Sequence, residues 1–233
     1  WNKFAMLSSV SYSRYGDLKM GTYGPDEYLR PFYVQRQDSA DVVVTNDDPR
    51  IQKPSGYNQI NLMQKFRYAP NDKWDIQYGF HWSETSSYAR YDRHIRYENG
   101  LPRYGEWSYG PQKWMMNALS ITHKGNNTMY DQMSIRLAQQ FFEESRISRN
   151  FNEYQRETNI ENVYAYSGNL DFVKSIGSKN KLYYGLEVIW NDVVSLGTNE
   201  NVSTGVTFEN ASRYPQSNWS SYGLYVSDQY RVH

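Results

Sequence analysis

The stretch from Trp74 to Ser83 reads WDIQYGFHWS, and its pattern decides the fold class. Every second residue, starting with Trp74, is large and apolar or aromatic, and the residues between them are polar or small. Side chains in a β-strand point alternately to two faces. The stretch therefore predicts one strand with an apolar face and a polar face. A half-buried strand of a soluble β-protein would show the same alternation.

Trp74 and Trp82 lie at the two ends of the apolar face of this strand. At about 3.3 Å per residue, they are roughly 26 Å apart along the strand. A strand of an outer-membrane barrel carries an apolar band about 25 Å tall between two girdles of aromatic residues. The spacing of the two tryptophans fits such a strand.

The composition is polar and electrically balanced. The chain has 233 residues, 25 Lys and Arg against 25 Asp and Glu, 23 Tyr, and no Cys. No run of about 18 apolar residues occurs, which rules out a membrane-spanning helix but not a barrel with a polar interior. A zero net charge argues against a nucleic-acid partner. Without cysteine, disulfides, thiolate zinc sites and cysteine nucleophiles are excluded.

Seven further stretches read as strands, which gives about eight in all: 3–14, 58–68, 112–123, 129–142, 162–174, 182–190 and 220–232. We expect long connections at 15–56, 84–111, 143–161 and 191–219, and short ones at 69–73, 124–128 and 175–181. A further short strand is expected at 42–44. Outer-membrane barrels alternate short periplasmic turns with long extracellular loops. The sequence therefore predicts an all-β fold, an antiparallel transmembrane β-barrel, over residues 1–233.

Polar residues share one face of these expected strands, and we expect them to line the barrel lumen. An arginine in the middle of a strand, such as Arg136, requires that its face be wet. The expected lumen residues are Gln59, Asn61, Lys65, Asp75, Gln77, Gln132, Arg136, Asn169, Asp171 and Glu187.

Two segments resemble the barrel of TonB-dependent outer-membrane receptors: residues 109–119 (YGPQKWMMNAL) and 218–230 (NWSSYGLYVSDQY). This resemblance implies a 22-stranded barrel closed by a plug domain, of which this chain holds about eight strands and no plug. It also implies import of a scarce ligand, such as a ferric siderophore, haem, cobalamin or a glycan, with energy from TonB. The chain begins within one strand and stops abruptly after another, so we expect an excerpt of a longer protein.

The loop at 84–111 is the expected ligand-binding segment, because arginines alternate there with aromatic residues. Guanidinium groups suit carboxylates and phosphates, and aromatic faces suit flat or sugar-like ligands. The candidate ligand-binding residues are Arg90, Tyr91, Arg93, His94, Arg96, Tyr97, Arg103, Tyr104 and Trp107. The alternative is that these arginines bind lipopolysaccharide phosphates or pair with Asp92, Glu98 and Glu106.

Catalysis and metal binding find little support in the sequence. Asp92 and His94 would share a strand face and form an acid–base dyad, but no further carboxylate cluster lies near them. The histidines, at positions 81, 94, 123 and 233, lack metal-ligand spacing. We therefore expect no enzyme activity, no catalytic residue, no cofactor and no metal site.

The expected function is that of an outer-membrane receptor or transporter in a bacterial cell. Its expected partners are outer-membrane lipid and lipopolysaccharide, a small ligand such as a metal chelate, and TonB through the plug. A small passive barrel or porin, and a soluble β-sandwich that binds carbohydrate, are the alternatives.

Overall fold

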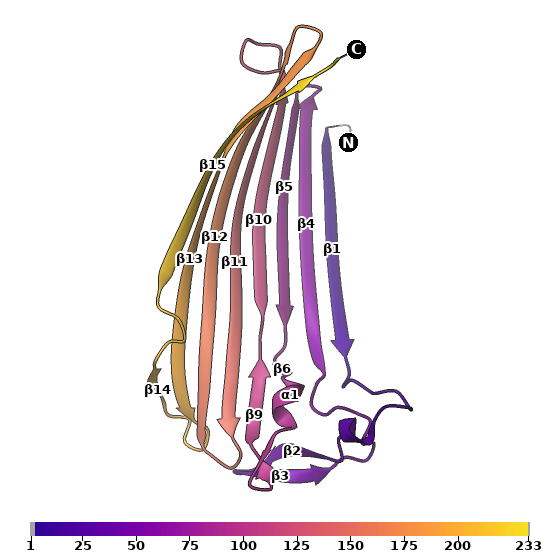
Figure 1. Ribbon diagram of the computed structural model, residues 1–233, viewed down its shortest axis with the longest axis vertical. Coiled ribbons are helices and arrows are strands. Elements are labelled where there is room, and N and C mark those ends of the chain that lie inside the picture. The colour runs from indigo at the N-terminus through magenta and orange to yellow at the C-terminus, as the bar shows by residue number, and fades with distance from the viewer. Residues whose placement is uncertain (1–2, 233) are drawn as a thin grey trace.

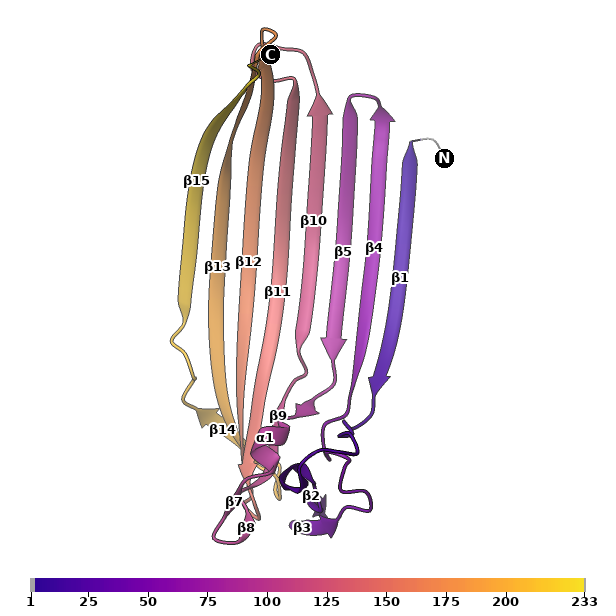
Figure 2. The ribbon, with the colours of Figure 1, turned by 45° about the vertical axis from the view of Figure 1, so that its right-hand side comes forward.

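The computed structural model describes residues 3–232, and its main feature is a single curved antiparallel sheet (Figure 1). Within these residues, the long strands follow one another across the sheet in chain order (Figure 2). The sheet is open, with β1 at one edge and β15 at the other. The long strands are β1 (Phe4–Tyr15), β4 (Tyr57–Asn71), β5 (Trp74–Thr85), β10 (Lys113–Lys124), β11 (Gln132–Asn150), β12 (Gln155–Ile176), β13 (Asn180–Asn201) and β15 (Ser217–Tyr230). The predicted all-β antiparallel fold is confirmed, and closure into a barrel stays a prediction.

The connections at the two ends of the sheet differ in length. At one end the strands are joined by short turns at 72–73, 125–131 and 177–179, and the first and last strands have their free ends there (Figure 1). The opposite end, which we call the loop end, carries short elements within its longer connections. These are η1 (Asp26–Tyr28), β2 (Phe32–Gln37), β3 (Ala40–Thr45), β6 (Tyr88–Ala89), α1 (Tyr91–His94), β7 (Tyr97–Glu98), β8 (Leu101–Pro102), β9 (Tyr104–Tyr109) and β14 (Thr207–Asn210). The short strand expected at 42–44 is confirmed within β3.

Two of the expected long loops are wrong. Residues 143–161 continue β11 and β12 and are joined only by the turn 151–154. Likewise, β13 runs on to Asn201, so only the later part of 191–219 is a loop. The cause is chemical, because these extensions carry polar residues on both faces and lose the apolar alternation that marks a strand. Their backbone ladders nevertheless remain paired over their whole length.

The register confirms that the expected lumen residues share one face. Arg136 lies opposite Asn169, which lies opposite Glu187, and Gln77 continues the same row through Ser120. Polar side chains on this face pair with one another. Arg136 pairs with Asp171, Arg67 pairs with Asp75, and Asn169 donates a hydrogen bond to Glu187 at 2.7 Å. We call this face of the sheet the polar face.

The other face, which we call the apolar face, changes character at one level of the sheet. Phe141 on β11 lies opposite Tyr164 on β12, with their ring centroids 5.2 Å apart. Two residues further toward the loop end, Glu143 lies opposite Asn162. The apolar part of this face therefore ends in aromatic residues and gives way to polar ones across neighbouring strands.

A second aromatic row crosses the apolar part of the sheet near the short turns. Neighbouring rings in this row have centroids 4.2 to 5.8 Å apart, and its members are Trp74, His123, Tyr130, Phe172 and Tyr184. Phe172 and Tyr164 are eight residues apart on β12, which is roughly 26 Å at about 3.3 Å per residue. Two aromatic rows thus bracket an apolar band of that height.

The sheet has no conventional hydrophobic core. Among residues 3–232, Trp107 is the only buried hydrophobic side chain, with 7% of its surface exposed. Apolar side chains of the sheet, such as Val10 and Leu224, are open to the surroundings. Nothing among residues 3–232 therefore covers the apolar face.

Candidate functional site

The loop-end extension of β11 carries an added layer of short strands. Strand β9 pairs with β11, so that Tyr109 lies opposite Arg146 and Trp107 lies opposite Ser148. Strand β6 pairs with β9 on its other side and places Tyr88 opposite Tyr109. These pairings continue the polar face of the sheet beyond the end of the apolar band.

Arginine side chains gather around Trp107 on this face. The guanidinium carbons of Arg90, Arg93 and Arg146 lie 5.1, 5.6 and 5.6 Å from the centroid of the Trp107 ring. Tyr109 packs edge-on against Trp107, with a centroid distance of 5.1 Å. We call Arg90, Arg93, Trp107, Tyr109 and Arg146 the arginine–aromatic cluster. Each cation–π contact of this kind contributes about 0.5 to 2 kcal/mol, depending on how far it is desolvated.

The polar contacts of the cluster leave donor capacity unused. Arg90 Nη1 donates to the Tyr109 hydroxyl at 2.9 Å, and Arg90 Nε donates to Asp92 at 2.7 Å. Among the described residues, the buried Nε atoms of Arg93 and Arg146 have no hydrogen-bond partner. A buried donor without a partner is costly. The cluster is therefore suited to accept an anion.

A row of tyrosines leads from the cluster across the polar face toward β1. Tyr15 stacks on Tyr57 at 4.7 Å, Tyr57 lies 5.8 Å from Tyr88, and Tyr88 lies 5.9 Å from Tyr109. Burial raises the pKa of Tyr88 above its ordinary value, with nearby Glu144 adding to the shift, so this hydroxyl stays protonated at neutral pH. The row offers aromatic edges and hydroxyl groups to a ligand over several strands.

His94 has a structural role beside the arginine–aromatic cluster. Its Nε2–H donates to the Trp107 carbonyl at 2.9 Å, and the side chain is buried. Burial lowers the pKa of His94 below its ordinary value, against the opposing effect of that hydrogen bond. The imidazole is therefore neutral, and it fixes the helical turn α1 against β9.

The dyad geometry expected for Asp92 and His94 does not form. The two residues lie on α1, one helical turn, and do not share a strand face. Asp92 contacts Arg90 at 2.7 Å and Arg93 at 3.7 Å, while His94 faces a backbone carbonyl. The arrangement leaves neither group positioned to exchange a proton with the other.

The structure divides the candidate ligand-binding residues into two groups. Arg90, Arg93, His94 and Trp107 come together, whereas the ring of Tyr91 packs against the Arg30 guanidinium at 5.7 Å. The others lie in or beside the hairpin of β7 and β8, where Arg103 contacts Glu98 at 3.7 Å and packs on Tyr104. This second group comprises Arg96, Tyr97, Arg103 and Tyr104.

The alternative pairing of the loop arginines is confirmed for two of three carboxylates. Asp92 and Glu98 pair with arginines of their own loop, as the preceding contacts show. Glu106 instead contacts Arg156 of β12 at 2.8 Å. Half of the loop's positive charge is thus held locally, and the cluster retains a positive excess.

A buried ion network lies on the opposite face of the extensions. Arg149 makes two hydrogen bonds of 2.7 Å to the Asp41 carboxylate, and these side chains are 2% and 0% exposed. Burial raises the pKa of Asp41, but hydrogen bonds from Arg149, the Asn152 backbone and Arg36 outweigh it and hold the pKa below its ordinary value. This pair fastens the β2–β3 hairpin to β11.

The network continues across three more strands. Arg156 Nη1 contacts Glu200 of β13 at 3.1 Å, in addition to its contact with Glu106 of β9. Gly105 lies beneath the Asp41–Arg149 pair, and a Cβ there would collide with the Asp41 carboxylate. The loops are therefore held in one arrangement at the loop end.

Sequence reasoning missed several members of this site. Arg146 and Arg149 fell within the segment expected to be a loop, and Tyr15 and Tyr57 stood at the borders of expected strands. A short strand pairs residues that are far apart in sequence, and no local signal marks such partners. The density of arginine and aromatic residues from 84 to 111 was the one usable signal, and it made candidates of three of the five cluster residues.

Residues 3–232 contain no group of three or more His, Cys, Asp or Glu side chains arranged to hold a metal ion. Within the same range, no helix is long and apolar enough to cross a membrane.

Comparison with solved structures shows a structural likeness to a known transporter. No family model and no curated protein matches the sequence. The structure is similar to that of the copper transporter OprC, with a TM-score of 0.63 and 11% sequence identity. The match covers 98% of this chain and 30% of the transporter chain, so this chain spans less than a third of that protein. At this identity the likeness shows the fold, and the chain therefore folds as part of a transporter does.

Proposed function

We propose that this chain forms part of the wall of a bacterial outer-membrane β-barrel that imports a scarce ligand. One observation carries the proposal: the apolar face is bracketed by two aromatic rows roughly 26 Å apart along β12 and turns polar beyond them. This is the height of the lipid-facing band of such barrels. Open strand edges are not tolerated in lipid, so β1 and β15 require partner strands, which the 22-stranded barrel implied by the family resemblance would supply.

In this orientation the short turns face the periplasm and the loop end faces the outside. Outer-membrane lipid covers the apolar band, and lipopolysaccharide surrounds the polar strand extensions at the loop end. The polar face then lines the lumen, where a plug domain that interacts with TonB would sit. The copper transporter with the similar fold supports transport as the kind of function.

The ligand that fits the arginine–aromatic cluster is a small anion with flat groups, such as a metal chelate. Three guanidinium groups meet there, and Asp92 is the carboxylate in contact with two of them. Aromatic faces and edges suit flat rings. Ferric siderophores, haem and cobalamin are the classes to be screened, and the protein is proposed to bind and release them without a chemical reaction.

Binding to the purified natural polypeptide that contains this chain tests the ligand proposal. We would titrate it in detergent with ferric citrate, a ferric tricatecholate, haem and cobalamin. Arg146→Gln and Arg90→Gln should each lower the affinity for the probe by about 10- to 100-fold, as expected for the loss of a charged hydrogen bond of about 1.5 to 3 kcal/mol. Arg96→Gln is the matched control, because Arg96 lies outside the cluster. Equal losses in all three variants, or no binding of any probe, would overturn the assignment.

Uptake in cells separates an energised receptor from a passive barrel. Deletion of TonB should abolish uptake of the bound probe while leaving its binding to the cell surface intact. A passive porin would keep both uptake and surface binding after deletion of TonB. Uptake that persists at the wild-type rate without TonB would refute the energised mechanism.

A further inference from the structure

Three side chains with soft or borderline donor atoms form a straight row across the polar face. Met63 on β4 lies opposite His81 on β5, and His81 lies opposite Met116 on β10. Residues directly opposite in an antiparallel pair have Cβ atoms about 4.5 to 5.5 Å apart. Two thioether sulfurs therefore flank one imidazole, within reach of a common point above the central strand.

The ring of His81 packs near that of Trp114, with their centroids 6.0 Å apart, but its nitrogens are free to bind an ion. Among residues 3–232, His94 bonds the Trp107 carbonyl and His123 bonds the Tyr130 hydroxyl at 3.0 Å, whereas neither ring nitrogen of His81 has a hydrogen-bond partner. Its Nε2 lies 3.7 Å from the position that a Cβ on Gly79 would occupy. The ring thus lies along the strand above Gly79.

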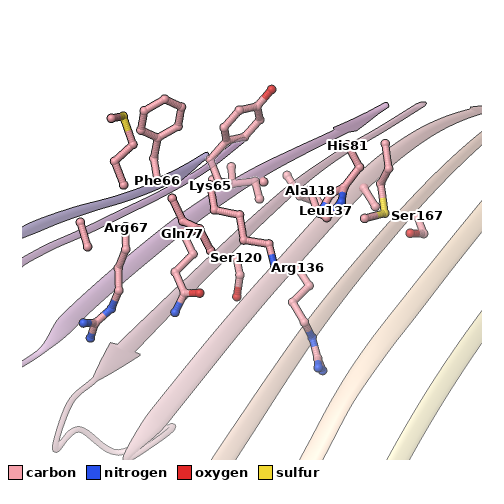
Figure 3. Close-up of a pocket in the computed structure, with 18 of the residues that line it drawn as sticks. Lys65, Phe66, Arg67, Gln77, His81, Ala118, Ser120, Arg136, Leu137 and Ser167 are labelled. Atoms are coloured by element: carbon pink, nitrogen blue, oxygen red, sulfur yellow. The ribbon is translucent and has the colours of Figure 1, made fainter. Parts of the chain in front are cut away.

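A hollow beside the row gives an ion access to these donors. Small side chains, those of Gly79, Ala118, Ala138 and Ser167, lie in one register row and line a hollow of about 540 Å³. His81 and Met116 both line it, and Figure 3 shows His81 beside it. Arg67, Gln77, Ser120 and Arg136 project together on one side of the sheet, while Phe66 projects to the other (Figure 3).

The charges around the hollow permit a monovalent cation. Arg67 and Arg136 are each paired with an aspartate, Asp75 and Asp171, which offsets their charge. Lys65 is the remaining cation at the edge, and its flexible stem allows the ammonium to turn toward open solvent. The row itself carries no carboxylate, since it continues to Ser9 on β1 and Gln140 on β11.

The donor set selects the kind of ion. Thioether ligands are soft and select Cu(I), while imidazole also suits copper. Hard ions such as Mg²⁺, Ca²⁺ and Fe³⁺ prefer carboxylate and carbonyl oxygen, which the row lacks. We propose that Met63, His81 and Met116 form a binding site for a soft monovalent metal ion, Cu(I) or its analogue Ag(I), on the polar face of the sheet. Methionine has three rotatable bonds, so the two sulfurs can converge on an ion held by His81.

Methyl resonances of methionine test the site directly. The natural polypeptide that contains this chain, labelled with ¹³C-methyl methionine and purified in detergent, would receive one equivalent of Ag(I), which is redox-inert. The methyl signals of Met63 and Met116 should shift, and that of Met115 should not. Met115 is the matched control, since it lies next to Met116 in sequence and on the opposite face of the sheet. Single Met→Leu variants assign the three signals.

A variant of the imidazole sharpens the test. His81→Gln keeps a polar side chain of similar size but removes the nitrogen ligand. The affinity for Ag(I), read from the Met63 and Met116 signals, should fall by more than the roughly 10- to 100-fold that is typical of losing a second-shell partner. Met115→Leu should bind Ag(I) as the wild type does. The site is refuted if the Met63 and Met116 signals stay fixed, if Met115 shifts equally, or if His81→Gln changes nothing.

The metal site and the proposed uptake function can fail separately. The resonance measurement requires neither transport nor TonB, and it reports on Met63 and Met116 alone. Shifted signals in a protein that imports none of the screened ligands would leave the metal site standing. Fixed signals in a working receptor would remove the metal site and leave the receptor.

Discussion

The apolar face of β11, β12 and β13 behaves in two ways along the same strands. Between the aromatic rows it presents side chains such as Leu137 and Val188 to the surroundings, and nothing in the described part of the chain covers them. Beyond Glu143 and Asn162 the same face carries the buried pair of Arg149 and Asp41. One continuous backbone ladder thus serves two different environments.

The comparison teaches that the two parts of the sheet are stabilised by different means. In the apolar band the ladder satisfies the backbone, and in the proposed outer-membrane setting lipid would take the place of a protein core. At the loop end water competes with every surface contact, so that fixed loops require buried, paired charges. Substitutions at the loop end should therefore release loops without opening the strands of the apolar band. Substitutions in the band should destabilise its strands without releasing the loops.

The largest effect is expected from Arg149→Ala. Removing one partner of a buried ion pair leaves an uncompensated charge and costs about 3 to 5 kcal/mol. Asp41 would lose its main partner, so the β2–β3 hairpin should detach from β11. Hydrogen exchange should show faster exchange in residues 32–45, while β4, β5 and β10 keep their protection.

Two further variants distinguish charge from shape at this pair. Gly105→Ala should release the same hairpin, because the added methyl group would collide with the Asp41 carboxylate. Arg36→Gln should have a small effect, since Arg36 is part-exposed and contacts Asp41 at 3.3 Å. Unchanged protection of residues 32–45 in Arg149→Ala would show that the pair does not hold the hairpin.

The next effect concerns Trp107, the buried centre of the arginine–aromatic cluster. Trp107→Ala should cost about 3 kcal/mol of local stability, as for other buried aromatic residues. Arg90, Arg93 and Arg146 would lose their common ring and disperse, so binding of an anionic probe should weaken. Trp107→Phe keeps an aromatic face, so it should retain part of the local stability and part of the affinity for the anionic probe. Equal behaviour of the two variants in hydrogen exchange of β9 would contradict this role.

The same comparison explains what the sequence could predict. Within the lipid-facing band, the alternation in stretches such as WDIQYGFHWS located the strands, their faces and the apolar height. At the loop end the extensions of β11 and β12 were taken for a loop, because Ser145, Arg146 and Ser148 lack an apolar alternation. Strands there are held by tertiary pairing, for which a single sequence gives no local sign.

The candidate site followed the same division. The density of arginine and aromatic residues from 84 to 111 indicated Arg90, Arg93 and Trp107, which do come together. Their partner Arg146 comes from a strand more than 30 residues later in the chain, and only the register of β9 with β11 brings it there. Cross-strand registers of this kind also produced the row of Met63, His81 and Met116.

A smaller, pH-dependent effect is expected from His94. Its folded-state pKa lies below its ordinary value, so its contribution to stability is complete above about pH 6.5 and is lost as the pH falls through the folded-state pKa. Protonation would place a second N–H on the buried Nδ1, which has no hydrogen-bond partner among the described residues. The protection of β9 amides against hydrogen exchange, relative to their intrinsic exchange rate at each pH, should therefore decrease as the pH falls below about 6.5.

Two controls isolate this pH effect. His94→Gln should remove the dependence on pH in that range while leaving the response of Asp41. The pKa of Asp41 is also lowered, so its contribution is lost only in more acidic solution, below its ordinary value of about 3.8. Protection of the β9 amides that is constant from pH 8 to pH 5, relative to the intrinsic exchange rate at each pH, would show that His94 does not support the cluster.

The smallest effect is expected within the lipid-facing band, at a polar row on its apolar face. Asn117 Nδ2 donates to Gln139 at 3.1 Å, and Asn117 Oδ1 accepts a hydrogen bond from the Tyr78 hydroxyl at 2.6 Å. Hydrogen bonds between side chains within membranes contribute on average about 0.6 kcal/mol in double-mutant cycles. The coupling between Asn117→Leu and Gln139→Leu in urea unfolding in lipid vesicles should therefore be near that value.

The size of this coupling decides what covers the row. If lipid covers it, Leu at both positions restores an apolar surface, and the double variant should be about as stable as the wild type, because both partners are removed together. A coupling above about 1.7 kcal/mol would exceed the largest value measured between side chains in a membrane. Such a value would mean that protein, not lipid, packs against Asn117, and the contrast between an uncovered band and a buried loop end would fail at this row.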